Sequence, residues 1–150
     1  MKFSTAKQIR FHHCDPAGIV FYPQFFYLLH EAQEDFLAHI GFPEHEMIRS
    51  GFGVPIVDLQ TQFMGMCRNG EQIRIDLTLW KLGNASLGMD YAIHGLANAD
   101  NAAAASPTPR LKARSVVVYS RVPDGQPVRI PDALRAALAP YLEETPTENP

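Results

Sequence analysis

Apolar and polar residues alternate in five separate stretches of this chain, and each stretch predicts a β-strand. Over residues 3–11, for example, Phe3 and Ile9 fall on one side of an extended chain while Ser4 and Gln8 fall on the other. A period of two is typical of a strand with one buried face. The same alternation predicts strands over residues 57–63, 73–79, 87–93 and 111–122.

Two short turns are expected between these strands. The pairs Asn69-Gly70 and Gly83-Asn84 tolerate positive φ, and each pair stands between two predicted strands, so each favours a hairpin. The later strands are therefore expected to follow one another as a meander. Residues 98–109, rich in Ala, Asn and Pro, are expected to form a mobile loop before the last strand.

Residues 24–40 give the clearest helix prediction. Their apolar positions follow the helical repeat and form one stripe, made of Phe25, Leu28, Leu29, Ala32, Phe36 and Ile40. Pro23 suits the first turn because it has no amide hydrogen to leave unpaired, and Gly41 suits the end. A shorter helix is predicted over residues 131–142, and residues 42–53 form a connector without a clear period.

The order of these elements predicts an α+β fold. One amphipathic helix needs one covering sheet, so we expect a five-stranded antiparallel sheet wrapped around the long helix, plus a short C-terminal helix. An edge strand of such a sheet must be covered or paired, and pairing two sheets edge to edge makes a homodimer the economical expectation. The domain is expected to span residues 1–142, and the acidic, Pro-containing tail 143–150 to be disordered.

Composition narrows the classes of function. The 150 residues suit one domain, and a formal net charge of -3 argues against sequence-independent nucleic-acid binding, which needs a basic face. We find no signal-peptide core and no apolar run long enough to span a membrane, so a soluble cytoplasmic protein is expected. The two cysteines lack metal-type spacing, and neither a metal ion nor a cofactor is expected.

The loop that precedes the long helix holds the strongest candidate for chemistry, Asp15. One interpretation is a capping or turn aspartate, which is common before Pro. However, Asp15 stands about nine residues before the clear helix start, in a loop stiffened by Pro16, Gly18 and Pro23. The other interpretation is therefore a carboxylate held near the exposed amides of a helix start, where such amides can stabilise an oxyanion.

The segment over residues 14–23 reads Cys-Asp-Pro-Ala-Gly-Ile-Val-Phe-Tyr-Pro. It closely resembles the active-site segment of 4-hydroxybenzoyl-CoA thioesterases, within the hotdog-fold acyl-CoA thioesterase superfamily. The resemblance implies a single hotdog domain that hydrolyses an acyl-CoA or aroyl-CoA to the free acid and CoA. It also implies that Asp15 is the nucleophile or general base and that the backbone amide of Tyr22 polarises the thioester carbonyl.

The resemblance implies further contacts with the substrate, each beside an ordinary structural interpretation. His13 is expected to hydrogen-bond the substrate or hold Asp15, or else to end a strand; Gly18 belongs to the Asp-Pro-Ala-Gly core. Residues expected near the acyl group are His30, His45, Val54, Pro55 and Ile56. Lys81 and Ser86, in a Lys-Leu-Gly-Asn-Ala-Ser turn, are expected to contact the nucleotide end of CoA, with Arg110, Lys112 and Arg114 as a second candidate patch.

Two other functions stay open at this stage. A hotdog dehydratase or hydratase would use a His with a carboxylate, and we do not find that pattern. A non-catalytic acyl-CoA-binding hotdog protein would not need the Asp-Pro-Ala-Gly context that this chain retains. The family also implies that homodimers assemble into a homotetramer, in one of two arrangements between which spacing does not decide.

Overall fold

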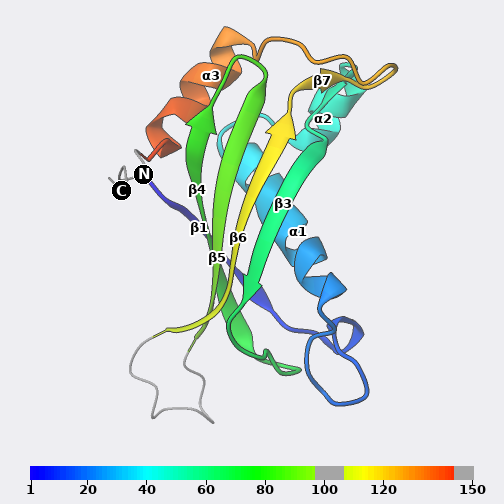
Figure 1. Cartoon of the computed structure of the whole chain (residues 1–150), viewed down its shortest axis with the longest axis vertical. Helices are drawn as coiled ribbons and strands as arrows, with labels where there is room; N and C mark the ends of the chain where they lie inside the picture. The colour runs from blue at the N-terminus through cyan, green and yellow to red at the C-terminus, as the bar shows by residue number, and fades with distance from the viewer. Residues whose placement is uncertain (97–106, 144–150) are drawn as a thin grey trace.

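The computed structural model describes residues 1–96 and 107–143, and these residues form an antiparallel sheet that curves around one long helix (Figure 1). The helix, α1 (Pro23–His39), lies across one face of the sheet, within one residue of its predicted bounds. The five strands of the sheet are β1 (Phe3–Gln8), β3 (Ile56–Phe63), β4 (Gln72–Leu82), β5 (Ser86–Gly95) and β6 (Thr108–Val118). The predicted α+β architecture is therefore confirmed.

The strand order corrects the predicted meander. The sheet runs β1-β4-β5-β6-β3, so β3 pairs with β6 at one edge and is not hydrogen-bonded to β4. The turn at Asn69-Gly70 consequently closes no hairpin between β3 and β4. Instead the Gly70 N–H donates to the Ile9 carbonyl, and the Ile9 N–H donates to the Glu71 carbonyl, so this turn attaches to the end of β1. The Gly83-Asn84 turn does close the predicted hairpin, between β4 and β5.

The remaining differences lie at the ends of elements. β1 stops at Gln8, because the chain turns into a short 3-10 helix, η1 (Phe11–His13), where the alternation had predicted more strand. The last predicted strand divides into β6 and a short β7 (Ser120–Arg121). The connector contains α2 (Glu44–Arg49) and β2 (Phe52–Gly53), which pairs with β7.

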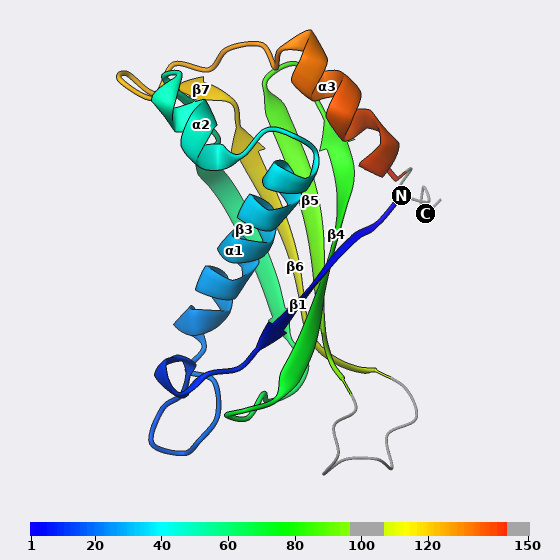
Figure 2. The same ribbon diagram turned by 180° about the vertical axis from the view of Figure 1, so that it is seen from behind.

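The predicted C-terminal helix is present as α3 (Asp132–Leu138), followed by a 3-10 turn, η2 (Ala139–Tyr141). Most of the predicted mobile loop (98–109) and of the predicted disordered tail (143–150) lies outside the described residues. Viewed from behind, α1 is seen crossing the concave side of the sheet, with α2 at the far end of α1 and α3 near the opposite edge (Figure 2). Among the described helices, none is long and apolar enough to cross a membrane.

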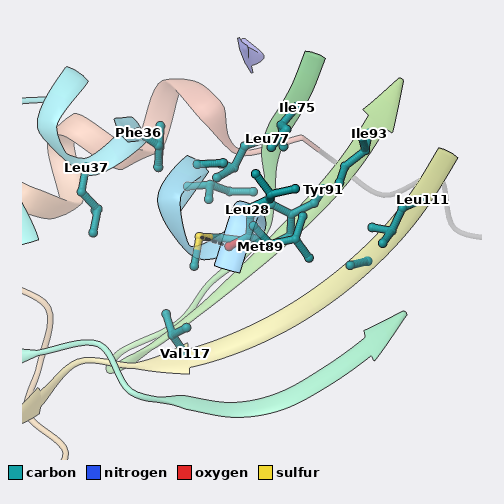
Figure 3. Close-up of a cluster of buried hydrophobic side chains, with 14 of the residues drawn as sticks. Leu28, Phe36, Leu37, Ile75, Leu77, Met89, Tyr91, Ile93, Leu111 and Val117 are labelled. Carbon is teal, nitrogen blue, oxygen red and sulfur yellow. Dashed lines mark hydrogen bonds between the residues drawn. The ribbon is translucent and has the colours of Figure 1, made fainter. Parts of the chain in front are cut away.

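The core forms between the apolar stripe of α1 and the inward residues of the three central strands. Leu28 and Phe36 pack toward Ile75, Leu77 and residues of β5 and β6, and all four of these named side chains have almost no exposed surface (Figure 3). Burial of each such side chain stabilises the fold by about 1.5–3 kcal/mol. This packing fixes α1, and hence the loop at its start, against the sheet.

The edge strand β3 departs from this pattern. It leaves most of its side chains exposed, and several of them are large and apolar: Ile56, Val57, Leu59 and Phe63. An exposed apolar edge strand is a ready surface for pairing with another strand. The opposite edge, β1, alternates between half-buried and exposed positions and is shorter.

Candidate functional site

The loop that carries Asp15 is closed on itself by backbone hydrogen bonds. The Asp15 N–H donates to the Ile19 carbonyl at 3.0 Å, and the Gly18 N–H donates back to the Asp15 carbonyl at 2.9 Å. Gly18 has a φ of 77°, a left-handed conformation that side chains disfavour. An isolated bridge between Ile19 and Arg68 ties the loop to the chain segment that precedes β4. The Asp-Pro-Ala-Gly segment is thus a tight, ordered turn.

The Asp15 carboxylate is half-buried and uses one oxygen within the loop. Its Oδ1 accepts a hydrogen bond of 2.9 Å from the Ala17 N–H. The carboxylate also lines a small pocket of about 330 Å³ with Phe11, Cys14, Pro16, Gly18 and Asn69. Asp15 does not cap α1, whose N-cap residue is Tyr22 and has no side-chain cap bond. Asp15 is therefore not a helix cap. It does stabilise the turn of its own loop, through the hydrogen bond from the Ala17 N–H.

The start of α1 leaves a backbone donor free beside this loop. The Phe21 N–H donates to the His13 carbonyl, and the Gln24 and Phe25 N–H groups donate to the carbonyls of Phe21 and Tyr22, which directly precede the helix. Pro23 has no N–H. Among the described residues, the turn, loop and cap hydrogen bonds do not use the Tyr22 N–H. This amide stands at the positive end of a 17-residue helix, which favours negative charge there.

His13 is buried and serves the shape of the loop. Its Nδ1 accepts a 2.8 Å hydrogen bond from the Arg10 N–H, and its ring lies 4.1 Å from that of His12. Burial, together with the nearby charge of His12, lowers the pKa of His13 below 6.5. The ring therefore favours the neutral form, with the proton on Nε2. Among the described residues, His13 has no hydrogen bond to Asp15.

A larger pocket of about 530 Å³ lies between α1, α2 and the β3 edge. It brings together four predicted residues from separate parts of the chain: His30, Val54, Pro55 and Ile56. Most of the wall is apolar, and the exposed apolar side chains of β3 continue it. The structure thus brings these four residues together in one cavity, and its role as the acyl pocket stays a prediction.

Four further polar residues line this pocket and were missed from the sequence: Gln33, Glu44, Tyr91 and Ser115. Two of them, Gln33 and Ser115, interrupt a pattern of apolar residues and could have been noticed in the sequence. Gln33 interrupts the apolar face of α1 one turn after Leu29, and Ser115 occupies an inward position of β6 between Ala113 and Val117. A polar residue at a buried position needs a partner, so such interruptions indicate a functional pocket.

His45 is not among the residues that line the larger pocket. It is exposed on α2 and lines a neighbouring depression of about 360 Å³ with His30, Glu34 and Glu44. Ligand atoms of His30, Glu34 and Glu44 lie within 4.8 Å of one another, but two of the three residues are exposed and such acidic groups commonly gather without an ion. Nothing in the donor set assigns a metal there.

Lys81 and Ser86 meet at the β4–β5 turn. A Cβ placed on Gly83 would lie 2.5 Å from the Ser86 Oγ and 3.5 Å from the Lys81 Cε, so both side chains converge over this glycine. The turn lies at the upper end of the sheet in Figure 1, whereas the Asp15 loop lies at the lower end. Arg110 and Arg114 of the second candidate patch are instead paired with Glu71 and Asp90.

Comparison with known proteins agrees with this architecture. A family model described as the thioesterase-like superfamily matches residues 9–138. A 1,4-dihydroxy-2-naphthoyl-CoA hydrolase of Thermosynechococcus vestitus is 27% identical over 139 residues, covering 92% of this chain and 89% of the relative.

Solved structures show the same fold at lower identity. A 1,4-dihydroxy-2-naphthoyl-CoA thioesterase from Synechocystis aligns with a TM-score of 0.80 and 23% identity, covering 93% of this chain and 96% of that one. The dynemicin thioesterase aligns with a TM-score of 0.84 and 20% identity, covering 97% and 100%. A 4-hydroxybenzoyl-CoA thioesterase variant in complex with 4-hydroxybenzoyl-CoA aligns with a TM-score of 0.79 and 19% identity, covering 91% and 98%.

Proposed function

Because the chain belongs to the thioesterase-like superfamily, we propose that it hydrolyses an acyl-CoA or aroyl-CoA to the free acid and CoA. Two observations support this proposal: the Asp15 carboxylate is held in an ordered turn shortly before α1, and the Tyr22 N–H at the start of α1 is not used by the loop and cap hydrogen bonds of the described residues. Relatives that share most of the chain length are named as hydrolases of aroyl-CoA esters, which agrees with the proposal.

The chemistry needs few groups. A thioester carbonyl is electrophilic, and the thiol product has a pKa of about 8.5, so the leaving thiolate needs little help from a general acid. Asp15 attacks the carbonyl carbon directly or removes a proton from the attacking water, and the Tyr22 N–H stabilises the oxyanion that forms. In the direct route, water then hydrolyses the resulting anhydride and releases the acid.

The proposed site is completed by a second copy of the chain. Edge-to-edge pairing of β3 with β3 of a partner, antiparallel about a two-fold axis, would cover the exposed apolar residues of this strand. In that arrangement the start of β3 in one subunit lies beside the end of β3 in its partner. Since Phe63 at the end of β3 packs on the first turn of α1, the partner's pocket wall of Val54, Pro55 and Ile56 reaches the Asp15 end.

The same two-fold axis reverses the direction of the partner, so that opposite ends of the two subunits lie side by side. The partner's β4–β5 turn then lies at the same end of the dimer as Asp15, and this turn is our proposed contact for the nucleotide end of CoA, through Lys81 and Ser86. Two such dimers make the proposed homotetramer. The cytoplasmic location stays a prediction from the sequence.

A panel of CoA esters tests the proposal. Release of free thiol is followed with benzoyl, hydroxybenzoyl, short-chain and medium-chain acyl-CoA esters. Thiol release from one or more members, faster than from the same ester without protein, supports the thioesterase. Binding of these esters without any thiol release would favour the non-catalytic acyl-CoA-binding alternative. Hydration of an enoyl-CoA without thiol release would favour the hydratase.

A further inference from the structure

A largely buried ion pair joins β6 to the chain segment of residues 64–71, which follows β3. The Arg110 Nη2 lies 2.5 Å from the Glu71 Oε1, and the two side chains are only 20% and 11% exposed. The Arg110 Nη1 also donates to the Met66 carbonyl, and the Glu71 Oε2 accepts a 3.0 Å hydrogen bond from the Arg68 N–H. Because each side chain binds two partners, the ion pair holds the 64–71 segment at several points.

Backbone contacts attach the start of this segment to the same arginine. The N–H groups of Met64 and Gly65 both donate to the Arg110 carbonyl, at 2.8 and 3.1 Å. A Cβ on Gly65 would lie 3.3 Å from the Arg110 Cδ, so the chain runs closely over this side chain. The 64–71 segment lies between β3 and β4 and outside both strands. Its position therefore depends on such contacts and not on a sheet ladder.

The other side of this segment supports the loop that carries Asp15. The Val20 N–H donates to the Cys67 carbonyl at 2.9 Å, and the Asn69 N–H donates to the Gly18 carbonyl at 3.1 Å. Asn69 also lines the pocket of about 330 Å³ that contains the Asp15 carboxylate. The Asp15 turn thus rests on a segment that the ion pair holds in place.

The packing around the ion pair leaves it little freedom. Gly95, at the end of β5, lies directly against it. A Cβ at this position would come within 2.6 Å of both the Arg110 Nη2 and the Glu71 Oε1. This distance is too short for packed atoms, so a larger residue here would push the two charged groups apart.

We propose that Arg110 and Glu71 are positioning residues for the reaction of Asp15. Their ion pair fixes the 64–71 segment, and this segment holds the Asp15 turn in its place relative to the start of α1. A displacement of about 1 Å in a reacting group can lower a rate by about a hundredfold. The inference rests on the proposed thioesterase function, and it deepens that function by giving two residues outside the Asp15 pocket a part in the chemical step.

The alternative is that the ion pair contributes to stability alone, and a second ion pair provides the comparison. The Arg74 Nε lies 2.9 Å from the Asp76 Oδ1, with the aspartate side chain 7% exposed. Among the hydrogen bonds of the described residues, neither side chain is bonded to the 64–71 segment. Arg74→Gln therefore breaks a comparable ion pair without disturbing the support of the Asp15 turn.

Three variants disturb the proposed ion pair in different ways. Glu71→Gln keeps the size of the side chain, but it leaves one acceptor oxygen where two donors now bind. Arg110→Lys keeps the charge and replaces the forked guanidinium with a single ammonium. Gly95→Ala keeps both charged groups and forces them apart. If one of these variants does not fold, the others still test the proposal.

Steady-state thiol release gives the first measurement. We expect kcat to fall by about tenfold or more in the variants that fold, with KM within about twofold of wild type, because the change affects the chemical step and not ester binding. Arg74→Gln should keep the wild-type kcat, even where urea denaturation shows a similar loss of stability. A wild-type kcat in every folded variant of the ion pair would overturn the proposal, as would an equal fall in Arg74→Gln.

Amide hydrogen exchange separates this result from failure of the proposed function, in which the wild type releases no thiol. The Asp15 and Gly18 N–H groups are hydrogen-bonded within the turn, so their exchange should accelerate about tenfold or more in Glu71→Gln and Gly95→Ala, but not in Arg74→Gln. Alkylation of the buried Cys67 thiol, whose pKa burial raises to about 12, should accelerate in the same two variants. Wild-type exchange and alkylation in both would overturn the positioning role, whether or not the protein is a thioesterase.

Discussion

The ring of Phe63, near the end of the edge strand β3, lies 6.0 Å from the ring of Phe25, in the first turn of α1. The ring of Tyr22, the N-cap residue of α1, lies 6.2 Å from the ring of Phe63. The end of the edge strand therefore lies beside the side chain of the residue whose backbone amide is the proposed oxyanion donor. We therefore expect these aromatic side chains to couple the pairing of β3 to the start of the helix.

The first prediction concerns this contact. Phe63 is half exposed, so Phe63→Ala should reduce the free energy of unfolding by about 1–2 kcal/mol, less than the ~3–5 kcal/mol typical of a fully buried phenylalanine. The variant should also lower kcat, because the Tyr22 amide loses its support. Urea denaturation and thiol release measure the two effects. Phe63→Leu, which keeps an apolar contact, should retain most of both; wild-type stability and kcat in Phe63→Ala would contradict the coupling.

The second prediction concerns the turn around Asp15. Gly18 has a φ of 77°, and a Cβ at this position would meet no atom within 4 Å. Gly18→Ala therefore introduces backbone strain without a clash, at about 1–2 kcal/mol. We expect this loss in the free energy of unfolding, together with a lower kcat as the Asp15 turn shifts.

Gly53→Ala is the matched control for Gly18→Ala. Gly53 has no positive φ, and its Cβ would make an ordinary contact of 3.5 Å with Val122. Its effect on the free energy of unfolding should be clearly smaller. Equal losses in the two variants would show that the left-handed conformation of Gly18 is not what the fold requires.

The third prediction is a pH dependence of stability. The pKa of His13 is lowered by burial in the folded protein, so the unfolded chain binds more protons at this site. Stability is then fully present above the unfolded value of about 6.5 and is lost as the pH falls towards the folded pKa. Chemical denaturation at several pH values should show this decline, and it should be smaller in His13→Gln. His45→Gln, on the surface of α2, should keep the wild-type decline.

The fold was largely predictable from local patterns, and the exceptions have physical reasons. The apolar stripe on α1 is buried against the sheet, so the spacing of its apolar residues correctly predicted which face of the helix is buried. The position of β3 depends on pairing with residues that are distant in the sequence. Alternation predicts that residues 57–63 form a strand, but it does not predict that this strand pairs with β6. Asn69-Gly70 is a real turn, and it was assigned to the wrong pair of elements for the same reason.

The candidate site was predictable in one part only. The Asp-Pro-Ala-Gly segment can be recognised from the sequence, because its residues are contiguous. The pocket combines side chains from five elements, and Glu44 and Ser115 have no local pattern that joins them. His45, expected near the acyl group, is exposed on α2 and lines a neighbouring depression instead of the pocket of about 530 Å³.

The fourth prediction concerns the nucleotide end of CoA. Lys81 is exposed at the β4–β5 turn, so Lys81→Ala should raise KM for CoA esters more than it lowers kcat, because it removes a contact remote from the reacting carbonyl. Steady-state kinetics on the best ester of the panel measures both. Lys112→Ala, on the outer face of β6, is the matched control. A rise in KM with Lys112→Ala and none with Lys81→Ala would move the nucleotide site to that face.

The most direct measurement is single-turnover hydrolysis by Asp15→Asn. The change keeps the size of the side chain and its acceptor for the Ala17 N–H, but it removes the charge that attacks or activates water. We predict that the rate of the chemical step falls by on the order of a hundredfold or more, while ester binding and the free energy of unfolding stay close to wild type. A single-turnover rate near that of the wild type, in a folded protein that binds the ester, would contradict the central role of Asp15.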